Sequence, residues 1–276
     1  MESATMKIRY GVFLAALAVV ALPARAQLAQ PNDAGVAMGH IHLFVKDVDA
    51  QKHFWIDTMG GTAVQNGPLP LIQFPGVFIM LRQADTTEPP AGSIVDHFGF
   101  AWKNMPARLA KWKADNVQIE QGGNPNQGYV DGPDGIRVEF FGDPSLSVPV
   151  QMNHIHFLPT DIPAMQAWYA KTFGGVPGKR ARQSSPGWVD CDDLPGVNLS
   201  FSLGKTALAP TKGRSLDHIG FEVKDLDAFV KKLEAQGIKM DMAIREVPNS
   251  RVKIAFFTDP WGTYIELTQG LAPSTN

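Results

Sequence analysis

Cysteine is almost absent from this chain: Cys191 is the only one among 276 residues. A single thiol excludes an intramolecular disulfide, and it also excludes zinc sites that are built from several thiolates. Any metal ion that this protein binds must therefore be held by nitrogen and oxygen atoms. We interpret Cys191 itself as a small packed thiol.

An excess of charge of either sign is also absent. The 25 lysines and arginines nearly balance the 27 aspartates and glutamates, which leaves a formal net charge of −2. This composition lacks the basic character of a nucleic-acid-binding domain. The hydrophobic share of 44% is typical of globular proteins. At roughly 100 to 200 residues per domain, the length predicts two compact domains.

The chain has no apolar run of transmembrane length. The longest run, Tyr10 to Leu22, is shorter than the roughly 20 residues that a membrane-spanning helix needs. It follows the positive residues Lys7 and Arg9 and precedes small residues suited to cleavage, which is typical of a secretory signal peptide. We therefore expect residues 1–26 to be removed and the mature protein to begin near Gln27. This predicts a periplasmic or secreted protein without a stable membrane anchor.

The sequence repeats itself in two ways. Residues 39–47 (GHIHLFVKD) are echoed by residues 153–161 (NHIHFLPTD). Residues 96–103 (DHFGFAWK) are echoed by residues 217–224 (DHIGFEVK). Because repeats at a fixed spacing indicate duplicated structural units, each half of the chain contains two related units.

Each of the four units reads as βαβββ. A short β-like run is followed by a helical stretch, clearest over residues 226–236, where apolar residues share one face and Gly237 provides a stop. Runs rich in β-branched and aromatic residues follow the helices, at 76–81, 136–141, 196–202 and 264–268. The sequence thus predicts an α+β fold in which four tandem βαβββ units form two cupped, mixed β-sheet barrels with flanking helices, one per half.

Two pairings of these units are compatible with the repeats. Neighbouring units could pair (first with second, third with fourth), or exchanged units could pair (first with fourth, second with third). The expected boundaries are a linker over 27–37, a first module over 38–145, a second module over 152–270 and a tail over 271–276, with residues 144–151 joining the modules.

Histidines are concentrated at the four strand starts. Six of the seven lie there, namely His40, His42, His97, His154, His156 and His218. Each half then ends in a turn and a strand that carries a carboxylate, Glu139 after residues 132–135 (GPDG) and Glu266 after residues 259–262 (DPWG). A glutamate inside an apolar strand is costly to bury without a partner, and a metal ion is one such partner. An outward-facing, solvated glutamate is the alternative.

Two imidazoles and one carboxylate that converge from different strands suit Fe(II), Mn(II), Zn(II) or Ni(II) and leave open positions for water or substrate. Such an ion acts as a Lewis acid on a substrate oxygen, or it activates water or dioxygen. The pattern therefore predicts a divalent metal site that can support catalysis.

Side chains two residues apart on a strand face the same side. His42 and His156 therefore face the same side as the first histidine of their strands, where an acid–base role or plain packing is expected. By the same alternation, Arg137 and Tyr264 accompany the two glutamates as candidate pocket residues. We expect Glu266, His156 and Tyr264 to be the catalytic residues.

At these residues the sequence resembles the vicinal oxygen chelate superfamily, which includes glyoxalase I, methylmalonyl-CoA epimerase, type I extradiol dioxygenases and bleomycin-resistance proteins. The resemblance spans about residues 38–270 and is carried by the strand starts at His40 and Asp217 and by the Asp-Pro-Trp-Gly-x-x-x-Glu ending at Glu266. It implies first-strand ligands at His40 and His154, fifth-strand ligands at His97 and His218, and last-strand ligands at Glu139 and Glu266.

The fourth-strand ligand of the family does not carry over. Glyoxalase-like and epimerase-like members have Glu or Gln there, whereas this chain has Met80 and Ser200. This favours the three-ligand pattern of the extradiol dioxygenases. Those enzymes, however, have a histidine and a tyrosine ahead of the final Asp-Pro turn. Here Phe256 stands at the tyrosine position and no histidine lies between His218 and Glu266, which disfavours ring cleavage of catechols.

Three functions are compatible with these residues. The first is an exported metal-dependent enzyme that acts on a small organic molecule through neighbouring oxygens, by isomerisation, lyase chemistry or oxygenation, with Fe, Zn, Ni or Mn as the metal. The second is a non-catalytic binding protein of the bleomycin-resistance type. In the third, one module is catalytic, and the second module is favoured. The expected partner is a small-molecule substrate, with no nucleic acid, and the protein is expected to be a monomer or homodimer.

Overall fold

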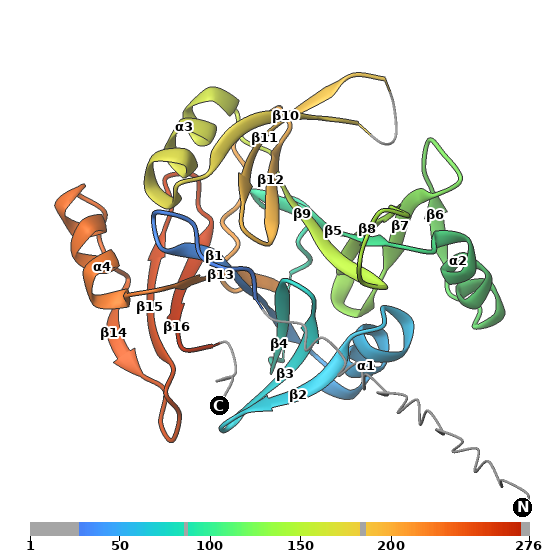
Figure 1. Ribbon diagram of the computed structural model, residues 1–276, viewed down its shortest axis with the longest axis horizontal. Helices are drawn as coiled ribbons and strands as arrows, with labels where there is room; N and C mark the ends of the chain where they lie inside the picture. Colours follow the sequence, from blue (N-terminus) through green and yellow to red (C-terminus); the bar gives the residue numbers. More distant parts are fainter. Residues whose placement is uncertain (1–27, 86–87, 183–185, 272–276) are drawn as a thin grey trace, which may run out of the picture.

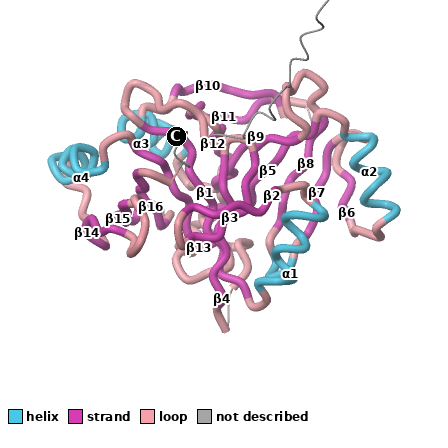
Figure 2. Tube along the Cα trace, turned by 60° about the horizontal axis from the view of Figure 1, so that its bottom comes forward, coloured by secondary structure: helices cyan, strands magenta, loops and turns pink. Residues whose placement is uncertain are grey.

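The computed structural model describes residues 28–85, 88–182 and 186–271, so the predicted signal peptide lies outside the described residues. Two eight-stranded sheets dominate this part of the chain, with the helices at the periphery (Figure 1 and Figure 2). In spatial order the first sheet contains β14 (Met242–Glu246), β15 (Lys253–Thr258), β16 (Tyr264–Gln269), β13 (Leu216–Val223), β1 (Val36–Val45), β4 (Val77–Gln83), β3 (Leu69–Phe74) and β2 (Thr62–Asn66).

The second sheet has the same plan. In spatial order it contains β10 (Val176–Ala181), β11 (Trp188–Leu194), β12 (Val197–Phe201), β9 (Val150–Phe157), β5 (Val95–Trp102), β8 (Arg137–Gly142), β7 (Gln127–Asp131) and β6 (Ile119–Gln121). Parallel and antiparallel pairs occur in both sheets. The prediction of an α+β fold with two mixed sheets built from βαβββ units is confirmed.

The sheets join units from different halves of the chain. β1 of the first unit is antiparallel to β13 of the fourth, and β5 of the second unit is antiparallel to β9 of the third. The expectation of one sheet per half is therefore wrong, and the exchanged pairing is the one present. Each first strand pairs in parallel with the fourth strand of its own unit, which leaves its other edge to pair with another first strand. Because the four first strands are alike in sequence, the local pattern does not select the partner.

The aromatic core, in contrast, connects units within each half. In the first half, the Trp55 ring stacks on Phe98 at 5.8 Å between ring centroids. In the second half, the Phe173 and Phe221 rings lie 4.5 Å apart. Backbone pairing thus crosses the halves while aromatic packing stays within them, so both kinds of contact hold the four units in one body.

Four α-helices, α1 (Val48–His53), α2 (Met105–Ala114), α3 (Ile162–Phe173) and α4 (Leu226–Ala235), are found in the described residues. A π-helical turn, Phe54–Thr58, extends α1, and a 3-10 turn, Pro133–Gly135, precedes β8. Each α-helix begins after an aspartate or asparagine whose side chain accepts backbone N–H groups of the first turn, at Asp47, Asn104, Asp161 and Asp225.

The helix predicted over residues 226–236 is confirmed. It ends at Ala235, and Gly237 beyond it has a φ of 82°, the left-handed conformation that glycine adopts without strain. No helix in the described part of the chain is long and apolar enough to span a bilayer.

Candidate functional site

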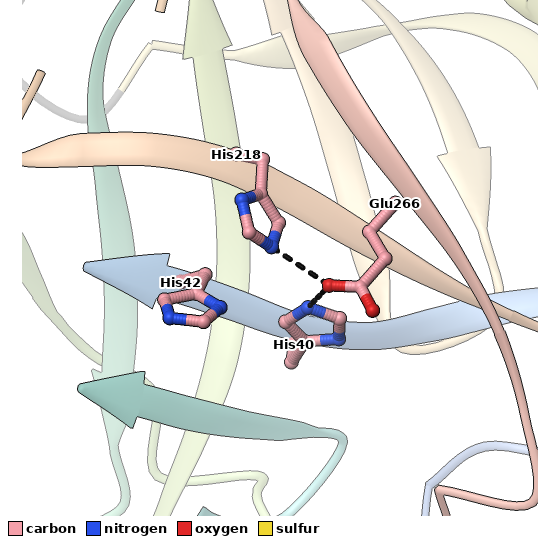
Figure 3. Close-up of side chains that lie close together, drawn as sticks. All are labelled: His40, His42, His218 and Glu266. Atoms are coloured by element: carbon pink, nitrogen blue, oxygen red, sulfur yellow. Dashed lines mark hydrogen bonds and ion pairs between the residues drawn. The ribbon is translucent and has the colours of Figure 1, made fainter. Parts of the chain in front are cut away.

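Four side chains from three strands of the first sheet converge, and we call them the first site (Figure 3). His40 and His42 come from β1, His218 from β13 and Glu266 from β16. Glu266 Oε2 lies 3.0 Å from His40 Nε2 and 2.8 Å from His218 Nε2. One potential ligand atom from each of the four residues lies within 4.8 Å of the others. The exchanged pairing thus brings donors from both ends of the chain together.

Glycine provides the space for the first-strand histidine. The register of β1 and β13 pairs His40 with Gly220, and a Cβ atom on Gly220 would collide with the His40 ring. In the second sheet, Gly99 pairs with His154, and its Cβ atom would collide with that ring in the same way. The glycine of each Asp-His-x-Gly repeat therefore allows the neighbouring imidazole to lie flat over the strand.

Asp217 orients His218 from behind. The buried Asp217 Oδ2 accepts a hydrogen bond from His218 Nδ1 at 2.6 Å, which assigns a proton to Nδ1, and the Nε2 atom on the other side of the ring faces Glu266. Burial lowers the pKa of His218, but its hydrogen bonds to Asp217 and Glu266 outweigh burial and raise it. This position therefore attracts positive charge. Two imidazoles, a facing carboxylate and a carboxylate behind one imidazole fit a divalent metal ion.

His42 has two buried ring nitrogens without a hydrogen-bond partner in the described structure. Its ring centroid lies 4.5 Å from that of His218. In the parallel register of β1 and β4, Met80 lies opposite His42, so a thioether occupies the fourth-strand position. Burial holds the pKa of His42 well below its ordinary value. The ring is therefore neutral at pH 7.

A cavity of about 520 Å³ opens over the first site. Its lining includes His42, His218 and Glu266. Tyr264 also lines it, with its ring stacked on Phe256 at 5.0 Å between centroids and edge-on to His218 at 5.8 Å. A cavity of this size suits a small organic molecule. Further lining residues are apolar, among them Leu69, Met80, Met242, Ile254 and Leu271.

The second sheet repeats the arrangement, and His97, His154, His156 and Glu139 form what we call the second site. Glu139 Oε2 lies 3.1 Å from His97 Nε2 and 3.2 Å from His154 Nε2. Asp96 Oδ2 accepts a hydrogen bond from His97 Nδ1 at 2.6 Å. The residue types and their strands therefore match those of the first site.

Neighbouring polar side chains, however, engage the donors of the second site. Gln127 Nε2 donates a hydrogen bond to Glu139 Oε1 at 2.7 Å. His154 Nδ1 donates to Asn153 Oδ1 at 3.0 Å. These bonds fix both side chains, and the amide competes with any cation for the free oxygen of Glu139.

Further polar groups around the second site are paired, although the buried Nδ1 atom of His156 has no hydrogen-bond partner in the described structure. His156 Nε2 lies 2.8 Å from Ser202 Oγ. Arg180 Nε donates to Ser200 Oγ, the fourth-strand position, at 2.7 Å. A cavity of about 690 Å³ lies on this sheet, and its lining in the described residues includes Arg180 but none of the four residues of the second site. A ligand in this cavity would therefore not contact the four residues of the second site.

Both glutamates are held in the ionised form. Burial alone would raise the pKa of Glu139 and of Glu266, but the adjacent histidines outweigh burial and hold each pKa far below its ordinary value. Burial lowers the pKa of His154 to about 3 and that of His156 to about 2. A charged carboxylate is the ionisation state that metal binding requires of Glu139 and Glu266.

The predicted residues lie in these two sites or beside them. Tyr264 lies in the first cavity, as expected for a pocket residue. Arg137 lines neither cavity in the described structure. Its guanidinium lies 4.1 Å from the centroid of the Tyr129 ring and forms an ion pair with Glu120. Arg137 thus contacts the second site only through Tyr129, whose ring lies 5.4 Å from that of His97.

Several neighbours of the two sites were missing from the sequence-based prediction. Tyr129 pairs with Glu139 as Phe256 pairs with Glu266, so a tyrosine occupies in the second site the position that is phenylalanine in the first. Tyr129 and Gln127 lie on β7, outside the repeated segments, where no motif marks them. The roles of the aspartate and glycine were detectable in principle, because Asp-His-x-Gly occurs twice.

Each sheet is built from paired βαβββ units and has histidines on its first strands and a glutamate on its last. These features define a duplicated module with a candidate metal site in each sheet. The model of the Glyoxalase/Bleomycin resistance protein/Dioxygenase superfamily matches residues 37–140 and 151–267. The chain belongs to this superfamily. A relative, the uncharacterized protein YaeR of Escherichia coli (strain K12), is 29% identical over 122 residues, which cover 42% of this chain and 94% of that protein.

Solved structures show the same fold. Glyoxalase I from Zea mays aligns with a TM-score of 0.68 at 17% sequence identity, over 85% of this chain and 92% of that one. A putative dioxygenase from Bacillus subtilis aligns with a TM-score of 0.62 at 12% identity, over 89% of this chain and 86% of that one. At these identities the likeness concerns the fold.

Proposed function

We propose that this protein is a metal-dependent enzyme whose catalytic centre is the first site. The substrate is a small organic molecule that binds the metal through neighbouring oxygens. One observation carries the proposal. His40, His218 and Glu266 converge from three strands, both histidines lie within 3.0 Å of Glu266, and a cavity of about 520 Å³ lies beside them. Side chains that served only to pack the sheet would not need a cavity beside them.

The residues of the first site have distinct roles in this proposal. His40, His218 and Glu266 would hold the metal ion, which when bound supplies Lewis-acid polarisation of a substrate oxygen. The neutral His42 accepts a proton at a ring nitrogen. Burial raises the pKa of Tyr264 to about 12, so its hydroxyl stays protonated at pH 7 and can donate a hydrogen bond to the substrate. These groups support proton transfer of the isomerase or lyase type.

Metal binding tests the proposal directly. Purified mature protein is incubated in turn with Fe(II), Zn(II), Ni(II) and Mn(II), and the bound metal is quantified after removal of free ions. We expect Glu266→Gln to reduce affinity more than about tenfold, because it removes the only charged ligand of the first site. Glu234→Gln, at an exposed position of α4, serves as the charge-matched control. Failure of the protein to bind any of these ions would overturn the proposal.

The role of His42 has its own test. His42→Ala is expected to lower turnover by about 100-fold, the lower range for loss of a general base, while the amount of bound metal stays the same. His156→Ala, at the equivalent position of the second site, is the matched control and should leave both quantities unchanged. Loss of metal together with activity in His42→Ala would instead make His42 a metal ligand.

A second candidate function is a non-catalytic binding protein. The mainly apolar lining of the first cavity and the phenyl ring of Phe256 beside Glu266 favour it, because neither supplies a reactive group. Recovery of unaltered ligand after prolonged incubation with metal-loaded protein, together with binding that does not depend on metal, would support this function over the enzyme.

We also propose that the protein is exported and works in the periplasm or outside the cell. The positive start, apolar run and small residues of the first 26 residues support this. N-terminal sequencing of protein from the periplasmic fraction is expected to give a mature chain that begins near Gln27. Recovery of the uncut chain from the cytoplasm would contradict it.

A further inference from the structure

Three basic side chains line the first cavity without an acidic partner. They are Arg82 on β4, Lys212 before β13 and Arg245 on β14, and all three are exposed. None of them forms an ion pair with another described residue. Arg82 lies 5.3 Å from the centroid of the Phe44 ring, and Lys212 Nζ lies 4.2 Å from the centroid of the Tyr264 ring. Arg82 and Lys212 therefore contact aromatic faces, and no ion pair neutralises the charge of any of the three.

Arg137 and Lys253, elsewhere on the surface, each pair with an acid, which the three cavity residues do not. The two acids that line the first cavity, Asp217 and Glu266, are buried and hydrogen-bonded to His218. Both acids are thus already occupied. The three exposed cations leave an excess of positive charge at the cavity, which attracts anions.

Much of the wall of the cavity is apolar. Leu69, Met242, Ile254, Phe256 and Leu271 lie along the cavity and offer no charged group to a ligand. A ligand that fills this space must bury an apolar segment there, because an unpaired polar group would lose its hydration without compensation. The cavity thus presents metal-binding donors, an apolar wall and cations.

We propose that the substrate of the first site is an organic acid with an apolar body. Its oxygen-bearing reactive end meets the site, its aliphatic or aromatic body lies against the apolar wall, and its carboxylate is bound by Arg82, Lys212 and Arg245. This inference rests on the proposed function for the chelating end alone. The cavity alone recognises the apolar body and the carboxylate, so these parts of the substrate are bound without metal.

Matched probes test this on the metal-free, full-length mature protein. 4-Phenylbutanoate and its neutral counterpart 4-phenylbutan-1-ol share the apolar body and differ in charge. By calorimetric titration we expect the carboxylate to bind at least about tenfold more tightly, the contribution of one charge-assisted hydrogen bond. High salt should reduce the difference, because these cations are exposed. Equal affinities, or tighter binding of the alcohol, would overturn the proposal.

Variants locate the bound carboxylate. Lys212→Gln combined with Arg245→Gln is expected to bring the ratio of the two affinities close to one, while the affinity for the alcohol stays the same. Lys239→Gln, an exposed lysine outside the cavity lining, should leave the ratio unchanged. Arg180→Gln probes the cavity of the second sheet. If Arg180→Gln abolished the preference instead, the anion would bind there and the proposal would be wrong.

The outcomes separate this proposal from the proposed function. Metal binding without a preference for the carboxylate would remove the organic-acid substrate and leave the metal enzyme in place. A preference for the carboxylate in a protein that binds no metal would remove the enzyme and leave an organic-acid binding site.

Discussion

The two sites have the same ligand types on equivalent strands, but the residues around them differ in polarity. The residue before the first-strand histidine is Gly39 in the first site and Asn153 in the second. The strand partner of the glutamate is Phe256 in the first and Tyr129 in the second. The fourth-strand residue is Met80 in the first and Ser200 in the second.

The same contrast holds one residue pair further along the strands. Gln127, which bonds Glu139, is replaced by Ile254 at the equivalent register position of the first sheet. Protein groups thus bond Glu139 and the Nε2 atom of His156 in the second site, whereas the first site lies beside a largely apolar cavity. In the proposed function, this difference in neighbours makes the first site the catalytic centre, because its ligand atoms remain available to a metal ion and a substrate.

We expect the largest difference in turnover between the two sites when one equivalent histidine is removed from each. His218→Ala is expected to reduce metal affinity of the first site and turnover by more than about 100-fold, since loss of even an outer partner of a ligand costs about 10- to 100-fold. His97→Ala should leave turnover within about twofold of the unmodified protein. Bound metal per chain and steady-state turnover are the measurements. Equal losses in both variants would show that the two sites are functionally alike.

Loss of the charge behind the histidine should have the next largest effect. Asp217→Asn retains the shape of the side chain but removes the charge that supports the Nδ1 proton of His218. We expect metal affinity of the first site to fall by about 10- to 100-fold. Asp96→Asn is the matched change at the second site and should leave turnover intact. Competition with a chromophoric chelator measures the affinities, and an unchanged affinity in Asp217→Asn would contradict the orienting role.

Filling the space under an imidazole should have an intermediate effect. Gly220→Ala places a methyl group against the His40 ring, and such overpacking costs about 1–3 kcal/mol. Metal affinity of the first site is expected to fall by about tenfold, with a lower melting temperature. Gly178→Ala, where a Cβ atom meets only Cys191 Sγ at 3.8 Å, is the control strand glycine. A normal affinity in Gly220→Ala would mean that the His40 ring can move without cost.

The smallest predicted effect converts one feature of the second site into that of the first. Gln127→Ile removes the amide that donates to Glu139 and introduces the residue found at position 254. Metal affinity of the second site should rise severalfold, because a hydrogen bond to a charged group contributes about 1.5–3 kcal/mol and part of that is regained from the metal. Titration of His218→Ala protein isolates the second site. A decrease in affinity would show that Gln127 supports metal binding.

Much of the fold and of the ligand sets could be predicted from the sequence, and the reasons are physical. Strand alternation places His40 and His42 on one face of their strand, and the repetition of this pattern at His154 and His156 makes it visible. The pairing of units could not be predicted, because β1 meets equivalent edges on several similar strands. The neighbours could not be predicted either. Gln127 and Tyr129 reach Glu139 only through the register of β7 with β8, which depends on hydrogen bonding between strands rather than on any local motif.

The exchanged sheets also affect how the protein matures. His40 and Glu266 are 226 residues apart in the chain, so the first site cannot exist until the last strand has been synthesised and docked. Closing so long a loop is entropically unfavourable and slow, and a metal ion that bridges its ends stabilises the closed state by mass action. A metal ion bound in the first site would thus stabilise only the completely folded chain.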